Sequence, residues 1–426
     1  MMMGNGEHAM AEARRYIFVP LGSAGDVNPL LWLAGLARGA GHDVVCITHA
    51  GVEDLPKMAG FRTVGVGAAE DADRVIRNPD LWHPDRAFEL LAGQLPLWAR
   101  VMVPAIRDEV VPGRTVLVAG GLAFGARIVA EADRVPLVTV QLQPSVFMGV
   151  DDAPILRSGL GWLKRAPLWM RRVFFGLVHW RVDQLMAGPV NAMRRSFGLQ
   201  KPIRGVMRDW WMSPDRVLAM FPEWFAPLHG DWPAQAVLTR FPLYDLGDAR
   251  PVGKELEAFL GAGEPPVLVT PGSANVHARE FLAEAVEGCR RIGRRALLAT
   301  GHAGQVPGRL PAGSAHFEYA PFGQVFGLCA AVVHHGGRGT CSQGLSAGVP
   351  QLLMPMAHDQ PDNAWRLERL GVEAQLRPGR FRAAAVGEAL RRLIGSADVA
   401  AACQRLKGLV ARQMAPEEVA RLLEIG

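Results

Sequence analysis

The sequence predicts an α/β protein with two doubly wound domains, because strand-like and helix-like segments alternate in two series along the 426-residue chain. One series begins with the apolar run 16–21 and the other with residues 267–270, and each run leads into a glycine-containing turn. Strands that alternate with helices pair in parallel, since each helix carries the chain back across the sheet. A chain of this length can fill two cores of ordinary size.

The first series opens with a β-α-β unit. Residues 16–21 are followed by a tight loop, in which Asn28 suits the N-cap of a helix and Pro29 its first turn. The helix is expected over residues 30–40, and the second strand over 43–48. Further elements of this half are expected at residues 115–119, 123–133, 137–142, 217–221 and 237–241.

The second series follows residues 242–263, which contain several Gly, Pro and Asp residues and are expected to link two domains. Its first strand ends in the loop Pro271-Gly272-Ser273, and a later buried strand is expected at residues 330–333. Other elements are expected at residues 279–292, 296–300, 316–320 and 351–356, with several helices over 383–423.

The glycine-rich turn after strand 330–333 predicts an anion site. Gly336, Gly337 and Gly339 precede a helix expected over residues 340–347. Unpaired backbone N–H groups and the positive end of the helix dipole favour a phosphate there. His335 and Thr340 can add side-chain donors, whereas His334 is expected to pack in the core.

Polar side chains follow the next strand. A buried strand is expected over residues 351–356, and His358-Asp359-Gln360 stands at its carboxyl end. Ligands of open α/β sheets bind at the carboxyl ends of strands. A phosphate site beside carboxylate and amide groups suits a molecule with phosphate at one end and sugar hydroxyls at the other. We therefore expect a nucleotide-sugar site, with Asp359 and Gln360 on the sugar.

Composition narrows the functional classes. The net charge of +5 comes from dispersed Lys and Arg, so nucleic acid is not the expected partner. Five scattered cysteines without a CxxC pair, and no apolar run of membrane-span length, predict a soluble cytoplasmic protein. No cluster has the spacing of a metal site, and Asp71-Ala72-Asp73 is expected to be surface charge.

A basic, aromatic helix is expected over residues 167–186. Its apolar residues recur at helical spacing among arginines, and they are Trp169, Met170, Val173, Phe174, Leu177 and Trp180. Such a helix suits peripheral contact with the inner membrane surface or with a hydrophobic substrate. It equally suits a helix that covers the sheet of its own domain, and both interpretations stay open.

The segments HHGGRGTCSQGLSAGVP and MPMAHDQPDNA resemble the donor-binding signature of the family 1 (UDP-glycosyltransferase-like) glycosyltransferases. This resemblance implies the GT-B fold, with two Rossmann-like domains across a cleft, and inverting, metal-independent transfer without a cofactor. It implies an acceptor-binding domain over 1–241, a linker over 242–263, a donor-binding domain over 264–405, and a last helix over 406–426 that returns to the first domain.

The resemblance also assigns donor contacts. It implies phosphate contacts from Ser273, His335, Gly337, Arg338, Gly339 and Thr340, nucleoside contacts from Tyr319, Phe322 and Gln343, and sugar contacts from Asp359 and Gln360. Three positions depart from the family pattern: Gly339 replaces Asn, Gln343 replaces Glu, and Phe322 replaces Gln. The replacement at Phe322, beside the base, leaves the base open between thymidine and uridine. Ser273 is equally typical of a plain turn.

Asp26 is the candidate catalytic base, since transfer to a hydroxyl needs a proton acceptor and Asp26 follows the first strand. Its alternative role is a helix cap, which Asn28 and Pro29 are expected to fill instead. The resembled family often has His here with a later carboxylate partner, and neither is present. His83 and His49 are the other candidates.

Segments such as PLGSAGDVNP and FPEWFAPLHGDWP further resemble rhamnosyltransferases of rhamnolipid synthesis. That likeness implies transfer of L-rhamnose from dTDP-L-rhamnose to the hydroxyl of a 3-hydroxyalkanoyloxy-alkanoate lipid. A UDP-glucose-dependent enzyme acting on a polyketide, sterol or other small aglycone is the alternative. A sugar-nucleotide 2-epimerase and a non-catalytic nucleotide-sugar-binding helper are two further hypotheses.

Overall fold

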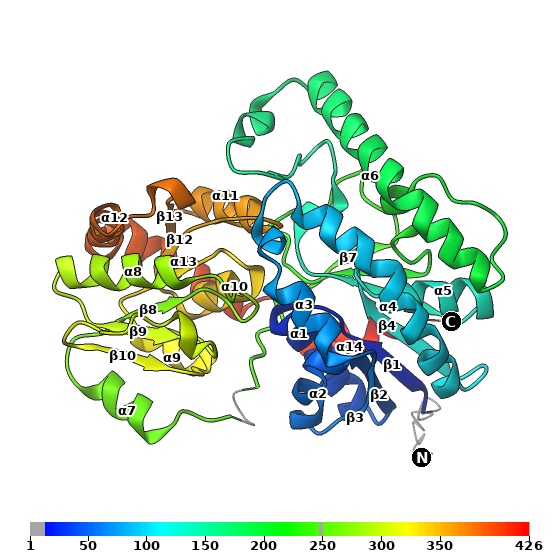
Figure 1. Ribbon diagram of the computed structural model, residues 1–426, viewed down its shortest axis with the longest axis horizontal. Helices are drawn as coiled ribbons and strands as arrows, with labels where there is room; N and C mark the ends of the chain where they lie inside the picture. Colours follow the sequence, from blue (N-terminus) through cyan, green and yellow to red (C-terminus); the bar gives the residue numbers. More distant parts are fainter. Residues whose placement is uncertain (1–12, 247–249, 426) are drawn as a thin grey trace, which may run out of the picture.

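The computed structural model describes residues 13–246 and 250–425 and has two lobes, each built on a parallel sheet (Figure 1). The first sheet has seven strands in the order β3-β2-β1-β4-β5-β6-β7, and the second has six in the order β10-β9-β8-β11-β12-β13. In both sheets the first strand of the lobe lies inside the sheet. The next two strands lie on one side of it and the later strands on the other, as in doubly wound folds. The predicted fold class is confirmed.

The first lobe alternates strands and helices up to residue 238. Its strands are β1 (Arg15–Val19), β2 (Asp43–His49), β3 (Arg62–Val66), β4 (Thr115–Gly120), β5 (Leu137–Gln141), β6 (Arg216–Ala219) and β7 (Ala236–Leu238). Its α-helices are α1 (Ala24–Gly39), α2 (Asp54–Met58), α3 (Ala69–Arg77), α4 (Ala87–Glu109), α5 (Phe124–Asp133) and α6 (Leu168–Ser196), and a short 3-10 helix, η2, covers Pro79–Trp82.

The second lobe begins with α7 (Lys254–Gly261). Its strands are β8 (Val267–Thr270), β9 (Ala296–Ala299), β10 (Ser314–Phe317), β11 (Ala331–His334), β12 (Gln351–Leu353) and β13 (Glu373–Gln375). Its other α-helices are α8 (Arg279–Arg291), α9 (Phe322–Val325), α10 (Arg338–Ala347), α11 (Gln360–Leu370), α12 (Ala383–Gly395) and α13 (Ala397–Ala411), followed by α14 (Pro416–Arg421).

Both sheets are buried on both faces, which explains their continuous apolar strands. In the first lobe, α1 and α14 cover one face, whereas α4, α5 and α6 cover the other. The last turn of the chain belongs to this lobe: Val419 and Leu423 are buried against α1, and the Tyr16 hydroxyl donates to the Leu423 carbonyl at 3.3 Å. The expected boundary at 405/406 falls inside α13.

A buried charge cluster joins the two lobes, as does an apolar cluster in which Phe221 of the first lobe packs with Leu367 and Leu406 of the second. Asp152 of the first lobe pairs with Lys164 at 2.7 Å and with Arg366 of α11 at 2.5 Å. Arg366 also pairs with Asp362 at 2.8 Å, and the Ile155 N–H donates to Asp362 at 3.0 Å. The charges are therefore neutralised by neighbours, as burial requires.

The predicted start of the first helix was wrong. Helix α1 begins at Ala24, with Ser23 as N-cap, and Pro29 lies inside it. Asn28 is not the N-cap, and its buried side-chain oxygen has no hydrogen-bond partner among residues 13–246 and 250–425. The cap is instead formed by the Ser23 hydroxyl and the Asp26 carboxylate, which are hydrogen-bonded to each other. The sequence prediction assigned the cap to Asn28 and therefore missed this pair.

The structure also differs from the prediction in several helices and strands whose sequence patterns are less regular. The expected linker 242–263 contains α7, and α6 extends to Ser196, ten residues past the expected end of the helix. Strand β3 and helix α4 were not predicted. Of these, α4 carries Pro96 and Pro104 inside it, which ordinarily indicate helix ends. Among the described residues, no helix has the length and apolarity needed to cross a bilayer.

Candidate active site

The N-terminus of α10 lies open at the carboxyl end of β11. Gly336 adopts φ +93°, a left-handed conformation that glycine accommodates without strain, and turns the chain into the helix. The N-cap is Gly337, which has no side chain to satisfy the first N–H groups. These donors and the helix dipole therefore remain available to an anion.

Arg338, the first residue of α10, is a buried cation without a partner. It is 4% exposed, and none of its three guanidinium nitrogens has a hydrogen-bond partner in the described part of the chain. Burial lowers the Arg338 pKa to about 10, against the opposing attraction of Asp359 and Asp26. The guanidinium thus stays charged at neutral pH, and a buried unpaired charge is unfavourable until an anion meets it.

His335 lies between two glycine turns. A Cβ atom on Gly337, or on Gly272 in the loop after β8, would collide with its imidazole ring. Burial, and secondarily the charge of His358, lowers the His335 pKa to about 4, so the ring is neutral at pH 7. Its buried Nδ1 atom has no partner among the described residues. A neutral ring can still donate one hydrogen bond to a phosphate oxygen.

The remaining predicted phosphate contacts differ in exposure. Thr340 is buried on α10, while Ser273 is exposed in the loop after β8. Space is open around Gly339, since a Cβ there would meet nothing within 4 Å. The prediction for His334 is confirmed: it is fully buried, 3.0 Å from Gln351 Oε1, and accepts a bond from the Gly336 N–H at 3.1 Å.

Asp359 and Gln360 begin α11 beside this turn. The Asp359 carboxylate accepts a bond from the Asn363 amide at 2.6 Å, and burial raises the Asp359 pKa. Gln360 is almost fully buried, and its amide oxygen accepts bonds from the N–H groups of Met356 and Ala357 at 2.8 and 3.3 Å. The Gln360 side chain therefore stabilises the loop before α11 through its oxygen. Its amide nitrogen donates no hydrogen bond to any residue that the structure describes.

Asp26 faces this group from the first lobe. Its carboxylate accepts bonds from the Ser23 N–H at 2.9 Å and the Ser23 hydroxyl at 3.0 Å. Burial raises the Asp26 pKa, the two bonds from Ser23 lower it, Asp359 raises it and Arg338 lowers it. Because a raised pKa improves a carboxylate as a proton acceptor, this position suits a general base as well as a cap.

Two first-lobe residues that the sequence did not single out, Leu81 and Trp82, contact the second lobe. Trp82, at the end of η2, lies edge-on to His335 with ring centroids 6.4 Å apart, and to His358 at 5.8 Å. His358 Nε2 lies 2.8 Å from the Leu81 carbonyl oxygen. His358 has φ +59°, a strained conformation for a non-glycine residue. No sequence pattern indicates this pairing, because it joins loops 277 residues apart.

The other histidines considered as bases have local roles. His49 is buried, accepts a bond from the Gly51 N–H at 3.0 Å, and lies edge-on to Trp98. The His83 Nδ1 atom accepts a bond from the Asp85 N–H at 3.2 Å.

The predicted nucleoside residues gather around α9. The Tyr319 hydroxyl donates to the Asp245 carbonyl at 2.5 Å, and the Arg250 guanidinium lies 4.1 Å from the ring centroid. Phe322 stacks on the buried Phe326, with centroids 4.5 Å apart. Gln343, on α10, is buried on the neighbouring helix. One face of Tyr319 is therefore already covered by a cation.

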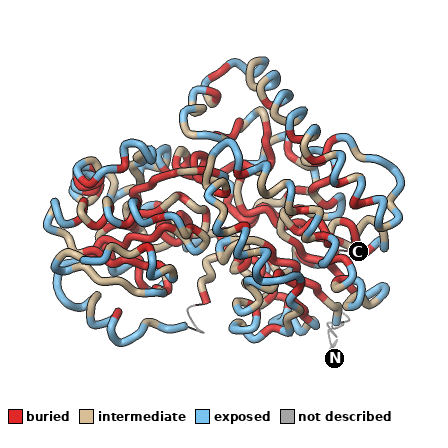
Figure 2. The backbone as a smooth tube through the Cα atoms, viewed as in Figure 1, coloured by how far each residue is buried: buried red, intermediate tan, exposed pale blue. Residues whose placement is uncertain are grey.

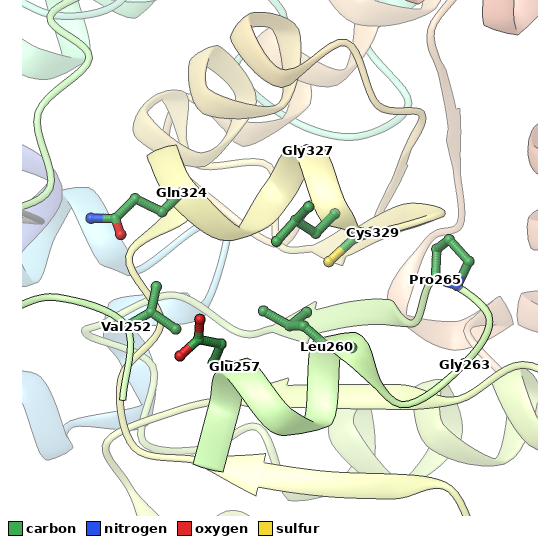
Figure 3. A pocket seen from close by; sticks show the side chains of 10 residues that line it. Val252, Glu257, Leu260, Gly263, Pro265, Gln324, Gly327 and Cys329 are labelled. Carbon is green, nitrogen blue, oxygen red and sulfur yellow. The ribbon is translucent and has the colours of Figure 1, made fainter. Parts of the chain in front are cut away.

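A groove of about 680 Å³ lies elsewhere in the second lobe, between α7 and the segment that follows α9 (Figure 3). Val252, Leu260, Leu328 and Cys329 contribute to its lining, and none of the predicted site residues does. The groove is therefore separate from the charged constellation. In the described ranges, no group of three His, Cys, Asp or Glu side chains could hold a metal ion.

The sequence of the chain is similar to a known family of proteins. Residues 297–425 match the family model described as the C-terminal domain of erythromycin biosynthesis protein CIII-like proteins. The chain is 30% identical to the O-mycaminosyltylonolide 6-deoxyallosyltransferase of Streptomyces fradiae over 96% of its length and 97% of the relative. It is 31% identical to the vancomycin aglycone glucosyltransferase of Amycolatopsis orientalis over 84% of each chain.

A solved structure agrees in fold. The spinosyn rhamnosyltransferase complexed with thymidine diphosphate superposes with a TM-score of 0.67 at 18% identity, over 96% of this chain and 99% of that one. Sequence likeness across nearly the whole of both chains, two doubly wound lobes, and the open α10 N-terminus together show that the chain belongs to the family 1 glycosyltransferases of GT-B fold.

Proposed function

We propose that this glycosyltransferase moves a hexose or deoxyhexose from a thymidine-diphosphate-linked donor to a hydroxyl group of a small hydrophobic aglycone of the polyketide type. The observation that carries the proposal is the buried, unpartnered guanidinium of Arg338 at the uncapped start of α10. A diphosphate supplies the negative charge that this position lacks.

The donor would lie along the carboxyl ends of the second sheet. Its diphosphate would meet the N–H groups of α10, Arg338 and His335, with Thr340 and Ser273 on either side. The sugar would lie near Asp359 and the amide nitrogen of Gln360, and the nucleoside near Tyr319, Phe322 and Gln343. Thymidine is favoured because the structural neighbour at TM-score 0.67 binds thymidine diphosphate.

The acceptor class rests on the relatives. Their names specify O-mycaminosyltylonolide and the vancomycin aglycone as substrates. This supports the small-aglycone alternative over the hydroxyalkanoyloxy-alkanoate lipid that was expected first. The rhamnolipid likeness has no counterpart among these relatives, although a rhamnosyltransferase is among the structural neighbours.

The reaction would be a single displacement. Asp26 accepts the proton of the acceptor hydroxyl as its oxygen attacks C1 of the sugar. The bond between C1 and the diphosphate oxygen breaks, and the leaving diphosphate takes the electron pair. Arg338, His335 and the α10 N–H groups stabilise the charge that develops on it. The configuration at C1 is therefore inverted.

Mass spectrometry of reaction mixtures tests the proposal. The donors are dTDP-glucose, dTDP-L-rhamnose and UDP-glucose, each paired with O-mycaminosyltylonolide, the vancomycin aglycone and a 3-hydroxyalkanoyloxy-alkanoate. A glycosylated aglycone formed from a dTDP donor is the expected product. Transfer to the lipid alone would contradict the acceptor class, and exclusive use of UDP-glucose would contradict the donor. Donor binding without any product would favour the non-catalytic helper.

A further inference from the structure

Helix α6 is apolar on two opposite faces. Its inner face is buried in the first lobe through Phe175, Val182 and Met186. Its opposite face consists of Trp169, Val173, Leu177 and Trp180, which we call the tryptophan face and which are 66, 58, 61 and 60% exposed. A surface helix normally presents polar side chains outward, so the inner face is explained by the fold and the tryptophan face is not.

The tryptophan face forms one continuous row. Its residues are spaced by four, four and three positions, so they lie on one side of the helix over a length of about 16 Å. Helix α6 lies along the edge of the molecule, and its first half extends beyond the sheet of the first lobe (Figures 1 and 2). The row can therefore meet a broad surface without obstruction from the second lobe.

Within the segment that carries this face, all charged side chains are basic. Residues 153–182 contain six Lys or Arg and no Asp or Glu. Arg165 and Arg172 are exposed, and their guanidinium groups take part in no hydrogen bond or ion pair in the described ranges, while Arg181 pairs with Glu89 at 2.7 Å. The first acid to follow, Asp183, turns inward and accepts a bond from the Val206 N–H at 2.9 Å.

The segment before α6 is anchored, so the face has a fixed position. Lys164 pairs with Asp152 at 2.7 Å, and Arg366 of the second lobe holds the other oxygen of the same carboxylate. The Arg171 guanidinium donates to the Val150 and Asp151 carbonyls at 2.8 Å each. A helix held in this way presents its outer row without a separate folding step.

We propose that the tryptophan face, with Arg165 and Arg172, docks the enzyme on an anionic lipid surface. Tryptophan side chains favour the boundary between headgroups and acyl chains, and arginines beside them meet lipid phosphates. A second copy of this chain would bring the same cations and no carboxylate from residues 153–182, so self-association through this face lacks charge complementarity. A lipid surface supplies both the apolar layer and the negative charge.

Co-sedimentation of the full chain with vesicles tests the proposal. Vesicles of phosphatidylcholine alone are compared with vesicles that contain phosphatidylglycerol, at low and high salt. Wild type is expected to bind the anionic vesicles, and more weakly at high salt. Trp169→Ser/Trp180→Ser and Arg165→Gln/Arg172→Gln are each expected to weaken this binding about tenfold or more. Leu328→Ser, at a 55% exposed position on the second lobe, is the matched control and should bind as wild type does.

Folding of each variant is checked by its thermal unfolding midpoint, and its oligomeric state by analytical ultracentrifugation. Absence of wild-type binding to anionic vesicles would overturn the proposal, as would binding that both double variants retain. A wild-type dimer that dissociates in Trp169→Ser/Trp180→Ser, without vesicle binding, would instead identify the face as a protein interface. If the tryptophan variant unfolds, the arginine variant decides the test, because the two guanidinium groups it removes are exposed and form no hydrogen bond or ion pair with the described residues.

Discussion

The two lobes contain the same local unit, a strand, a glycine turn and a helix N-terminus, but they complete it differently. After β1, Gly22 has φ +121° and Ser23 caps α1 together with Asp26. After β11, Gly336 has φ +93° and α10 begins with Gly337, which caps nothing. In the first unit an internal carboxylate occupies the anion position at the helix start. In the second, no side chain of the described residues caps the helix start, and the first residue of the helix is the buried cation Arg338.

Because of this difference, the starts of α1 and α10 suit different parts of one reaction. A helix start that holds its own carboxylate has no room for an external anion, yet it fixes that carboxylate in a buried place where its pKa rises. A helix start without a cap, beside Arg338, stays unfavourable until a ligand supplies the charge. The first unit thus suits proton transfer and the second suits binding of a diphosphate.

The largest expected effect comes from Asp26→Asn. The amide can still accept a bond from the Ser23 N–H, so the cap is partly kept while the base is lost. We expect kcat to fall about 10³-fold, with the donor Kd little changed, as measured by steady-state kinetics and calorimetry with thymidine diphosphate. Asp108→Asn, at an exposed position on α4, is the control. Transfer that persists in Asp26→Asn would leave Asp26 with the cap alone.

Arg338→Met is expected to act in opposite directions on activity and stability. Loss of the guanidinium should weaken binding of thymidine diphosphate and lower kcat/KM by about 10²-fold. Removal of an unpaired buried charge should raise the free energy of unfolding of the ligand-free protein by about 1 kcal/mol or more. Arg382→Met removes an exposed pair with Glu280 and should change neither. A less stable Arg338→Met variant with unchanged nucleotide affinity would contradict the assignment of Arg338.

The pH dependence of kcat/KM separates the two units further. Because burial raises the Asp26 pKa above its ordinary value, the basic form is gained only as pH rises past that higher pKa. We expect kcat/KM to fall about tenfold per pH unit below it, and this limb should disappear in Asp26→Asn. His335, with a pKa of about 4, would account for any acid limb that remains.

The raised pKa of Asp26 should also make the free energy of unfolding depend on pH. A carboxyl whose pKa is raised by folding favours the folded state most below its unfolded pKa, and this contribution is lost as pH rises through the folded pKa. Wild type should therefore lose stability relative to Asp26→Asn over that interval. Urea unfolding at several pH values measures the difference, and a constant difference would mean that the Asp26 pKa is not raised.

The sequence was enough to predict the fold and the open helix start. Apolar strands that alternate with helices define both sheets, and the glycines before α10 predict its free N–H groups. Short-range pattern failed at α1, where Asn-Pro is typical of a helix start but Ser23 and Asp26 lie one turn earlier and satisfy each other. The contact of Trp82 with His335 and His358 was beyond prediction, because it depends on how the lobes meet.

Ser23→Ala should have the smallest effect and addresses the cap directly. The variant removes the hydroxyl bond to Asp26 at 3.0 Å but keeps the Ser23 backbone bond. Loss of the N-cap side chain should lower the free energy of unfolding by about 1 kcal/mol, measured by urea denaturation. The hydroxyl also lowers the Asp26 pKa, so its loss should move the acid limb of kcat/KM to higher pH while thymidine diphosphate binds as before. If the stability falls and the limb does not move, Ser23 and Asp26 act only as a helix cap, and the difference between the two units is structural rather than catalytic.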